Sequence, residues 1–85
     1  MPARLILIIE DDPAVREVVA LALIDAGYRV ATVGDGQTAL RMAAALHPDV
    51  IVLDMRLPEL DGPLVLRELQ RRGETAPGVV VSVAR

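Results

Sequence analysis

The hydrophobic positions of this chain alternate between two periodicities. Continuous apolar runs at Leu5–Ile9 and Val50–Leu53 are typical of strands that are buried on both faces of a parallel sheet. A run with more polar residues, Tyr28–Val33, indicates a less buried strand, and Val79–Val83 predicts a fourth strand. Between these runs apolar residues recur every three or four positions, which is the period of an amphipathic helix. The pattern therefore predicts three strand–helix units followed by a last strand.

The first helix has signals at both ends. Asp12 is a suitable N-cap, Pro13 suits the first helical position, and Gly27 is suited to the position just after the helix. Leu21 and Ile24 lie off the apolar stripe, on a flank that a single contact with the sheet would leave exposed. The stripe itself comprises Val15, Val18, Val19, Ala22, Leu23 and Ala26.

The other two helices are bounded by Asp, Gly and Pro. Asp35 and Gly36 predict the start of the second helix and Pro48 predicts its end. The third helix is expected from about Pro63 to Arg72, with Gly73 ending it. The apolar positions of the second helix are Ala39, Leu40, Ala43 and Leu46.

Strands that alternate with helices predict an α/β fold. The units are expected to form a parallel sheet with right-handed crossovers, in the order βαβαβαβ. A length of 85 residues allows one domain at most. Three helices can cover the two faces of a four-stranded sheet only incompletely, since a parallel sheet needs helices on both faces. The sequence therefore predicts one incomplete α/β domain.

The composition excludes several classes of protein. The chain has 53% hydrophobic and 25% charged residues, and with one Tyr and no Phe or Trp its core must consist of aliphatic side chains. The absence of Cys excludes disulfides and thiolate metal sites. A net charge of −3 with nine scattered Arg residues and no Lys argues against direct binding of nucleic acid. No apolar run is long enough for a signal peptide or a membrane span, so we expect a cytoplasmic protein with no membrane partner.

Acidic residues follow two of the apolar strands. Glu10, Asp11 and Asp12 come after the first strand, and Asp54 comes after the third. Ligands of open parallel sheets bind beyond the carboxyl ends of the strands, so Glu10, Asp11 and Asp54 converge on one cleft if the two strands are neighbours. Oxygen ligands with no His or Cys nearby favour Mg²⁺. The simpler interpretation is that these acids are helix caps and solvated strand ends, as we expect for Asp12.

Four segments together resemble one known family, the receiver domains of response regulators. The segment Asp54–Gly62, with Pro58 four residues after Asp54, resembles the phosphoacceptor loop of these domains. Glu10 and Asp11 resemble the acid pair of the family. Asp35-Gly36 resembles the start of its second helix, and Pro77 followed by Val79, Val80, Val81 and Ser82 resembles its fourth strand.

The resemblance implies a fold and a domain extent. The fold is a flavodoxin-like, doubly wound parallel sheet with the strand order 2-1-3-4. Residues 1–85 would form the N-terminal two-thirds of a receiver domain, without its fifth strand and last two helices.

The same resemblance implies a phosphorelay function. Asp54 would accept a phosphoryl group from a sensor histidine kinase or a small phosphodonor, in a signalling module that is not an enzyme with turnover. Asp11 would bind Mg²⁺ directly, Glu10 would hold a metal-bound water, and Asp54 and the backbone carbonyl of Arg56 would complete the metal shell. Ser82 would be the switch hydroxyl that turns toward the phosphoryl group. A homodimer or an output domain is a further partner that the resemblance allows.

Two alternatives remain open at this point. One is a Mg²⁺-dependent phosphohydrolase with Asp54 as nucleophile, but haloacid-dehalogenase-like enzymes need a second Asp at the position of Arg56. The other is a receiver remnant that docks or dimerises through its exposed sheet edge. The family carries a Lys at the end of its fifth strand, and this chain has neither. Val83 also follows Ser82 where the family usually has a small residue.

The remaining polar residues have simpler interpretations. His47 precedes Pro48 at a predicted helix end, where an imidazolium would interact with the negative end of the helix dipole. Arg67, Arg71 and Arg72 are expected on a solvated face of the third helix, with Glu68 pairing with Arg72 four residues on.

Overall fold

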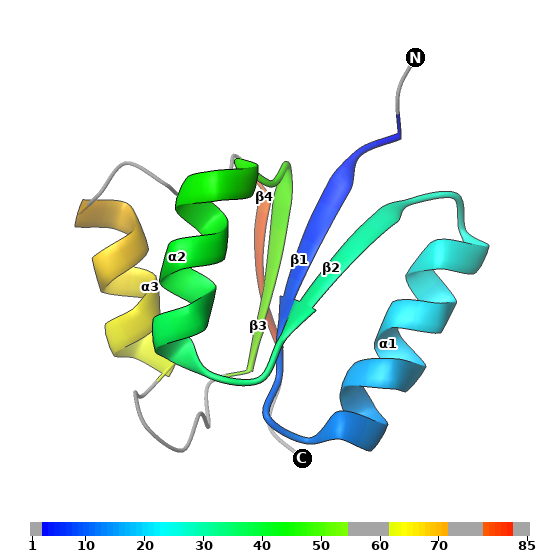
Figure 1. The fold of residues 1–85 in the computed structure, drawn as a ribbon, viewed down its shortest axis with the longest axis horizontal. Coiled ribbons are helices and arrows are strands. Elements are labelled where there is room, and N and C mark those ends of the chain that lie inside the picture. Colours follow the sequence, from blue (N-terminus) through cyan, green and yellow to red (C-terminus); the bar gives the residue numbers. More distant parts are fainter. Residues whose placement is uncertain (1–2, 55–61, 72–77, 83–85) are drawn as a thin grey trace.

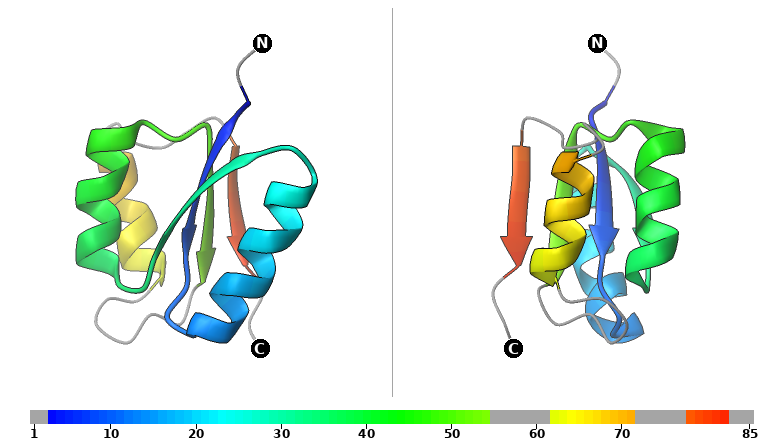
Figure 2. Two further views of the ribbon diagram at one scale, coloured as in Figure 1. Left: turned by 45° about the vertical axis from the view of Figure 1, so that its right-hand side comes forward. Right: turned by 90° about the vertical axis from the view of Figure 1, so that its left-hand side faces the viewer.

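A computed structural model describes residues 3–54, 62–71 and 78–82 of the chain. Four parallel strands form one sheet in the order β2-β1-β3-β4. α1 covers one face of the sheet, and α2 and α3 lie side by side on the other (Figures 1 and 2). The α/β class, the doubly wound arrangement and the predicted strand order are thereby confirmed. The elements are β1 (Leu5–Ile9), α1 (Pro13–Asp25), β2 (Arg29–Val33), α2 (Gly36–Leu46), β3 (Val50–Asp54), α3 (Gly62–Arg71) and β4 (Gly78–Ser82).

Two aspartates cap helices as the sequence predicts. The carboxylate of Asp12 accepts hydrogen bonds from the backbone N–H groups of Ala14 and Val15, at 2.9 and 3.3 Å. The carboxylate of Asp35 accepts from the backbone N–H of Thr38 at 2.8 Å and from its hydroxyl at 2.9 Å. Each cap satisfies N–H groups that have no partner within the helix.

The C-terminus of α1 explains why β2 starts one residue later than predicted. Gly27 has a φ of 99°, in the left-handed region that favours glycine. Its N–H donates to the carbonyl of Ile24 at 2.9 Å, and the N–H of Tyr28 donates to that of Leu23 at 3.1 Å. These two bonds form a Schellman motif. Because Tyr28 is used to end the helix, β2 begins at Arg29.

The α2–α3 face of the sheet contains the main core. As the composition predicts, every member of this core is aliphatic, and the last turn of α2 lies outside it. The buried members of this cluster are Leu7, Ile9, Val33, Ala39, Leu40, Ala43, Ile51, Leu53 and Leu69. Of the four apolar positions of α2, Ala39, Leu40 and Ala43 are buried and Leu46, in the last turn, is 40% exposed.

The helix on the opposite face is much less buried, although Ile6 and Ile8 of β1 are buried beneath it, and here the predicted stripe is wrong in half of its members. None of the 13 residues of α1, all of which are described, is buried. Val18 is 67% exposed, and Ala22 and Ala26 are also exposed. Only Val15, Val19 and Leu23 of the stripe are half-buried. The reason is that α1 packs chiefly against β2, at the edge of the sheet (Figure 1), so that a narrow line of side chains makes contact. Leu21 and Ile24 are exposed, as expected.

His47 has a role that its sequence position did not predict. It caps the C-terminus of α2 in the left-handed conformation, with a φ of 49°, and its N–H donates to the carbonyl of Ala43 at 3.0 Å. A residue other than glycine is uncommon in this conformation. Pro48 follows directly and prevents continuation of the helix.

Candidate functional site

The carboxyl edge of the sheet brings the predicted site residues into register. β1 and β3 are neighbours, with Ile9 opposite Leu53, so Glu10 follows β1 at the level at which Asp54 ends β3. On the other side of β3, Asp54 pairs with Ser82 of β4. Neighbouring strands lie about 4.8 Å apart. The backbone therefore places Glu10, Asp54 and Ser82 in a row along one edge, and the predicted adjacency of the two acid-ended strands is confirmed.

Glu10 is the most deeply placed acid of the described residues at this edge. It is 5% exposed, and its backbone is held from both sides. Its N–H donates to the carbonyl of Val33 at 3.0 Å, and its own carbonyl accepts from Nη1 of Arg16 at 3.0 Å. A buried carboxylate is costly unless it is hydrogen-bonded or lies beside a cation. The buried carboxylate of Glu10 is therefore suited to one side of a cation-binding site.

The neighbouring acids have different roles. Asp11 is half-buried and lies between Glu10 and the cap of α1. Asp12 is occupied by the cap, as the sequence predicts. Asp35 follows β2 near the same edge, but both of its oxygens are bound to Thr38. The hydrogen bonds from the Thr38 N–H and then from its hydroxyl lower the pKa of Asp35, so its carboxylate is a cap that stays ionised well below neutral pH.

Several predicted site features lie outside what the structure describes. Arg56, expected to supply a backbone carbonyl, and Val83 are not among the described residues, nor are the side chains of Asp54 and Ser82. Within the side chains that are described, three metal-ligating groups do not gather in one place. The side chains of Glu10 and Asp11, which are described, nonetheless fit Mg²⁺. This ion takes oxygen ligands and is commonly held by one or two carboxylates together with waters and a phosphate.

One residue of this edge was not predicted from the sequence. Arg16 extends from α1 to the end of β1, and its guanidinium lies against Gly34 in the turn after β2. No sequence signal identifies this contact, because it depends on how the first and second strand–helix turns sit beside each other.

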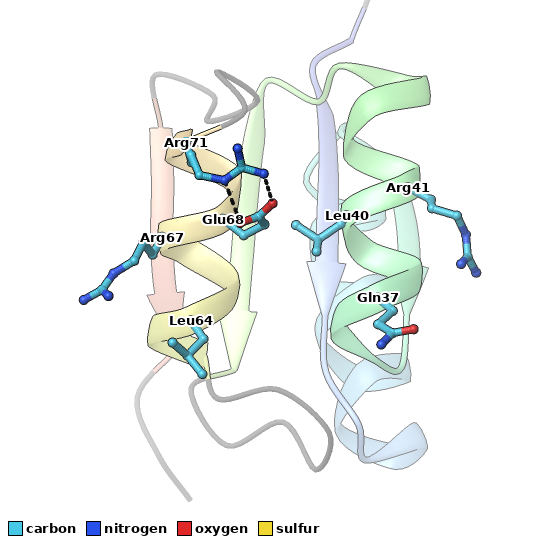
Figure 3. A pocket seen from close by; sticks show the side chains of 7 residues that line it. All are labelled: Gln37, Leu40, Arg41, Leu64, Arg67, Glu68 and Arg71. Carbon is cyan, nitrogen blue, oxygen red and sulfur yellow. Dashed lines mark hydrogen bonds and ion pairs between the residues drawn. The ribbon is translucent and has the colours of Figure 1, made fainter.

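A second surface feature is a groove between α2 and α3, with a volume of about 570 Å³ (Figure 3). Arg71 forms two hydrogen bonds with the carboxylate of Glu68, three residues before it, and the partner predicted for Glu68, Arg72, lies outside the described residues. Arg41 and Arg67 point away from each other in Figure 3, so their charges do not converge on one ligand. The groove is lined by Gln37, Leu40, Arg41, Leu64, Arg67, Glu68 and Arg71.

No helix within residues 3–54 and 62–71 is both long and apolar enough to cross a lipid bilayer.

Comparison with known proteins points to one family. Residues 6–85 match the family described as the response regulator receiver domain. The chain is 43% identical over 82 residues to the response regulator MprA of Mycolicibacterium vanbaalenii, an alignment that covers 96% of this chain and 35% of that protein. The chain thus spans about a third of the length of this curated relative.

Solved structures agree with this match. The receiver domain of a sensor histidine kinase from Pseudomonas aeruginosa, described with a magnesium ion coordinated in its active-site cleft, has a TM-score of 0.88 and 36% identity, and the match covers 98% of this chain and 69% of that one. The N-terminal domain of a response regulator receiver protein from Methanoculleus marisnigri has a TM-score of 0.89 and 28% identity, with 96% of this chain and 68% of that chain covered. The flavodoxin-like fold expected from the sequence is confirmed by these neighbours.

Proposed function

This chain belongs to the family of response regulator receiver domains, and on that premise we propose that it is a phosphoryl-accepting module with Asp54 as the acceptor. The observation that carries the proposal is the register of the sheet. It brings Glu10 and Asp54 to the ends of neighbouring strands, with Ser82 paired to Asp54. The proposed acceptor, an acid that can help to hold a cation and a hydroxyl residue thus lie along one edge.

The proposed reaction is a group transfer from a phosphohistidine of a sensor kinase. A carboxylate oxygen of Asp54 attacks the phosphorus, an O–P bond forms, and the P–N bond breaks with its electron pair leaving on the imidazole nitrogen. The product on this chain is an acyl phosphate at Asp54. The protein contributes mainly positioning and charge stabilisation, since phosphoryl transfer needs little other chemistry from it.

The neighbouring residues have supporting roles in this proposal. Asp11 would hold Mg²⁺ directly, Glu10 would hold it through water, and Asp54 and the backbone carbonyl of Arg56 would supply the protein's remaining oxygen ligands. When bound, the ion neutralises the charge shared by the carboxylates and the phosphoryl group. The hydroxyl of Ser82 donates a hydrogen bond to the new phosphoryl group and so couples phosphorylation to β4.

The wider assignments rest on the family. We propose that residues 1–85 correspond to the N-terminal two-thirds of a receiver, which agrees with the share of the solved receiver chains that is matched. The partners proposed are a sensor histidine kinase and an output domain or a second copy of the chain. Receiver domains are signalling modules rather than enzymes with turnover, and the cytoplasmic location expected from the sequence stays a prediction.

Intact-mass spectrometry tests the proposed acceptor. Incubation with acetyl phosphate and Mg²⁺ should add the mass of one phosphoryl group to the wild-type chain, because Asp54 is the nucleophile. Asp54→Asn should abolish this adduct. Asp25→Asn, which changes an exposed carboxylate at the far end of α1, should leave it unchanged. An unlabelled but folded wild-type chain, or an adduct that persists in Asp54→Asn, would contradict the assignment.

A further inference from the structure

The guanidinium of Arg16 joins two turns that are distant in sequence. Arg16 is the fourth residue of α1, at the end of its first turn, and is half-buried. Its Nη1 donates to the backbone carbonyl of Glu10 at 3.0 Å. The N–H of the same residue, Glu10, is bonded to Val33 at the end of β2. Both polar groups of the Glu10 backbone are thus held, one by the sheet and one by Arg16.

Gly34 leaves the space that this guanidinium occupies. A Cβ added at Gly34 would lie 2.8 Å from Nη1 of Arg16 and 4.0 Å from the carbonyl oxygen of Glu10. A contact of 2.8 Å is too short for a real Cβ, so with a side chain at this position the guanidinium, which is the flexible end of Arg16, would have to shift. The backbone angle of Gly34 is not in the left-handed region, since Gly27 is the described glycine that has a positive φ. Gly34 is therefore explained by the close approach of Arg16 and not by its own conformation.

We propose that Arg16 is a positioning residue: by holding the backbone of Glu10, it keeps the carboxylates of Glu10 and Asp11 in the geometry that binds Mg²⁺. Gly34 has no side chain and so leaves room for the guanidinium of Arg16. This inference rests on the proposed function, because it assigns the acid pair to the metal. Residues that orient metal ligands commonly affect metal affinity by about 10–100-fold when they are changed. Since Arg16 holds a backbone carbonyl and not a ligand side chain, we expect the lower end, about 10-fold.

The sign of the effect separates positioning from simple electrostatics. Arg16 carries a positive charge close to the acid pair, and this charge repels a cation. If charge were its only influence, Arg16→Ala would tighten Mg²⁺ binding. If Arg16 positions the backbone, the same substitution weakens binding.

The experiment is a Mg²⁺ titration of the ¹⁵N-labelled chain, followed by the amide signal of Asp11. Arg16→Ala should raise the Kd about 10-fold. Gly34→Ala keeps every charge and every hydrogen-bonding side chain, and it should raise the Kd in the same direction by a smaller factor. In the Arg16→Ala background, Gly34→Ala should have no further effect, because the added methyl group then has no guanidinium to displace.

A matched control removes the same charge elsewhere. Arg29 also donates to a backbone carbonyl, that of Ala3, at 3.1 Å. It lies at the start of β2, however, and so at the amino ends of the strands, opposite to the proposed metal site. Arg29→Ala should leave the Mg²⁺ affinity unchanged. A metal-free readout accompanies the titration: the amide of Glu10 should exchange its hydrogen faster in Arg16→Ala and in Gly34→Ala, while that of Leu7 should not.

The outcomes distinguish the inference from the function on which it rests. A folded wild-type chain without saturable Mg²⁺ binding would overturn the proposed function together with the metal part of the inference. Saturable wild-type binding with unchanged or tighter binding in Arg16→Ala would overturn the inference alone. Should Arg16→Ala fail to fold, by its circular dichroism, Gly34→Ala decides: unchanged Kd and unchanged exchange at Glu10 would overturn it.

Discussion

The two faces of the sheet use similar side chains with very different results. On the α2–α3 face, Leu69 of α3 is fully buried and Leu40 of α2 nearly so, in one continuous aliphatic cluster. On the other face α1 has Leu21 and Ile24, which are 58% and 53% exposed. The helices differ in what they contact, since α2 and α3 pack on the core and on each other, whereas α1 packs chiefly against the edge strand β2.

This difference shows what an apolar stripe can and cannot predict. A stripe at helical spacing indicates which way a helix turns its apolar side chains, because spacing determines which residues share a face. It does not indicate how wide the covered strip is, because that depends on the neighbours. On α1 the contact is one line of side chains wide, and Val18 lies outside it although it belongs to the predicted stripe.

The largest predicted effect tests this comparison directly with one substitution made on each face. Leu69→Ala should lower the free energy of unfolding by about 2–5 kcal/mol, because it opens a cavity in the core. Leu21→Ala should change it by less than about 0.5 kcal/mol, because the side chain is already in water and Ala favours the helix. Urea unfolding followed by circular dichroism measures both. Equal losses from the two variants would mean that α1 is covered in solution.

The next effect concerns a helix that has little tertiary support. Asp12→Ala should lower the free energy of unfolding by about 1 kcal/mol, because two backbone N–H groups of α1 lose their acceptor. Asp12→Asn keeps a capping oxygen and should lose much less. A loss in Asp12→Asn as large as that in Asp12→Ala would show that charge and not capping is responsible.

The smallest effect is a pH dependence at the start of α2. Bonds from Thr38 lower the pKa of Asp35 below its ordinary value of 3.8. A lowered pKa in the folded state means that the ionised carboxylate stabilises the fold fully above pH 3.8, and that this contribution is lost as the pH falls through the lowered value. Asn caps a helix without titrating, so the stability of wild type relative to Asp35→Asn should decrease as the pH falls from about 5 to 2. A difference that stays constant over this interval would exclude a lowered pKa for Asp35.

Much of the candidate site could be predicted from the sequence, because its members end strands. Glu10 and Asp54 each follow an apolar run, and parallel strands bring their carboxyl ends to one edge. The pairing of Asp54 with Ser82 required the register of β3 with β4. The role of Arg16 could not be predicted, since its hydrogen bond to the Glu10 carbonyl joins a helix to the end of a strand. The bond also depends on the absence of a side chain at Gly34.

The sequence by itself determined the order of the elements, the caps at Asp12 and Asp35, the end of α1 at Gly27 and the acids of the carboxyl edge. These features follow from local hydrogen bonding and periodicity, which involve residues close together in the chain. Only the tertiary structure decided which helices are buried against the sheet, which members of an apolar stripe are buried, and which arginine holds the backbone at Glu10. Those features depend on contacts between elements that are distant in sequence, and no local pattern records the distance or the angle at which two elements meet.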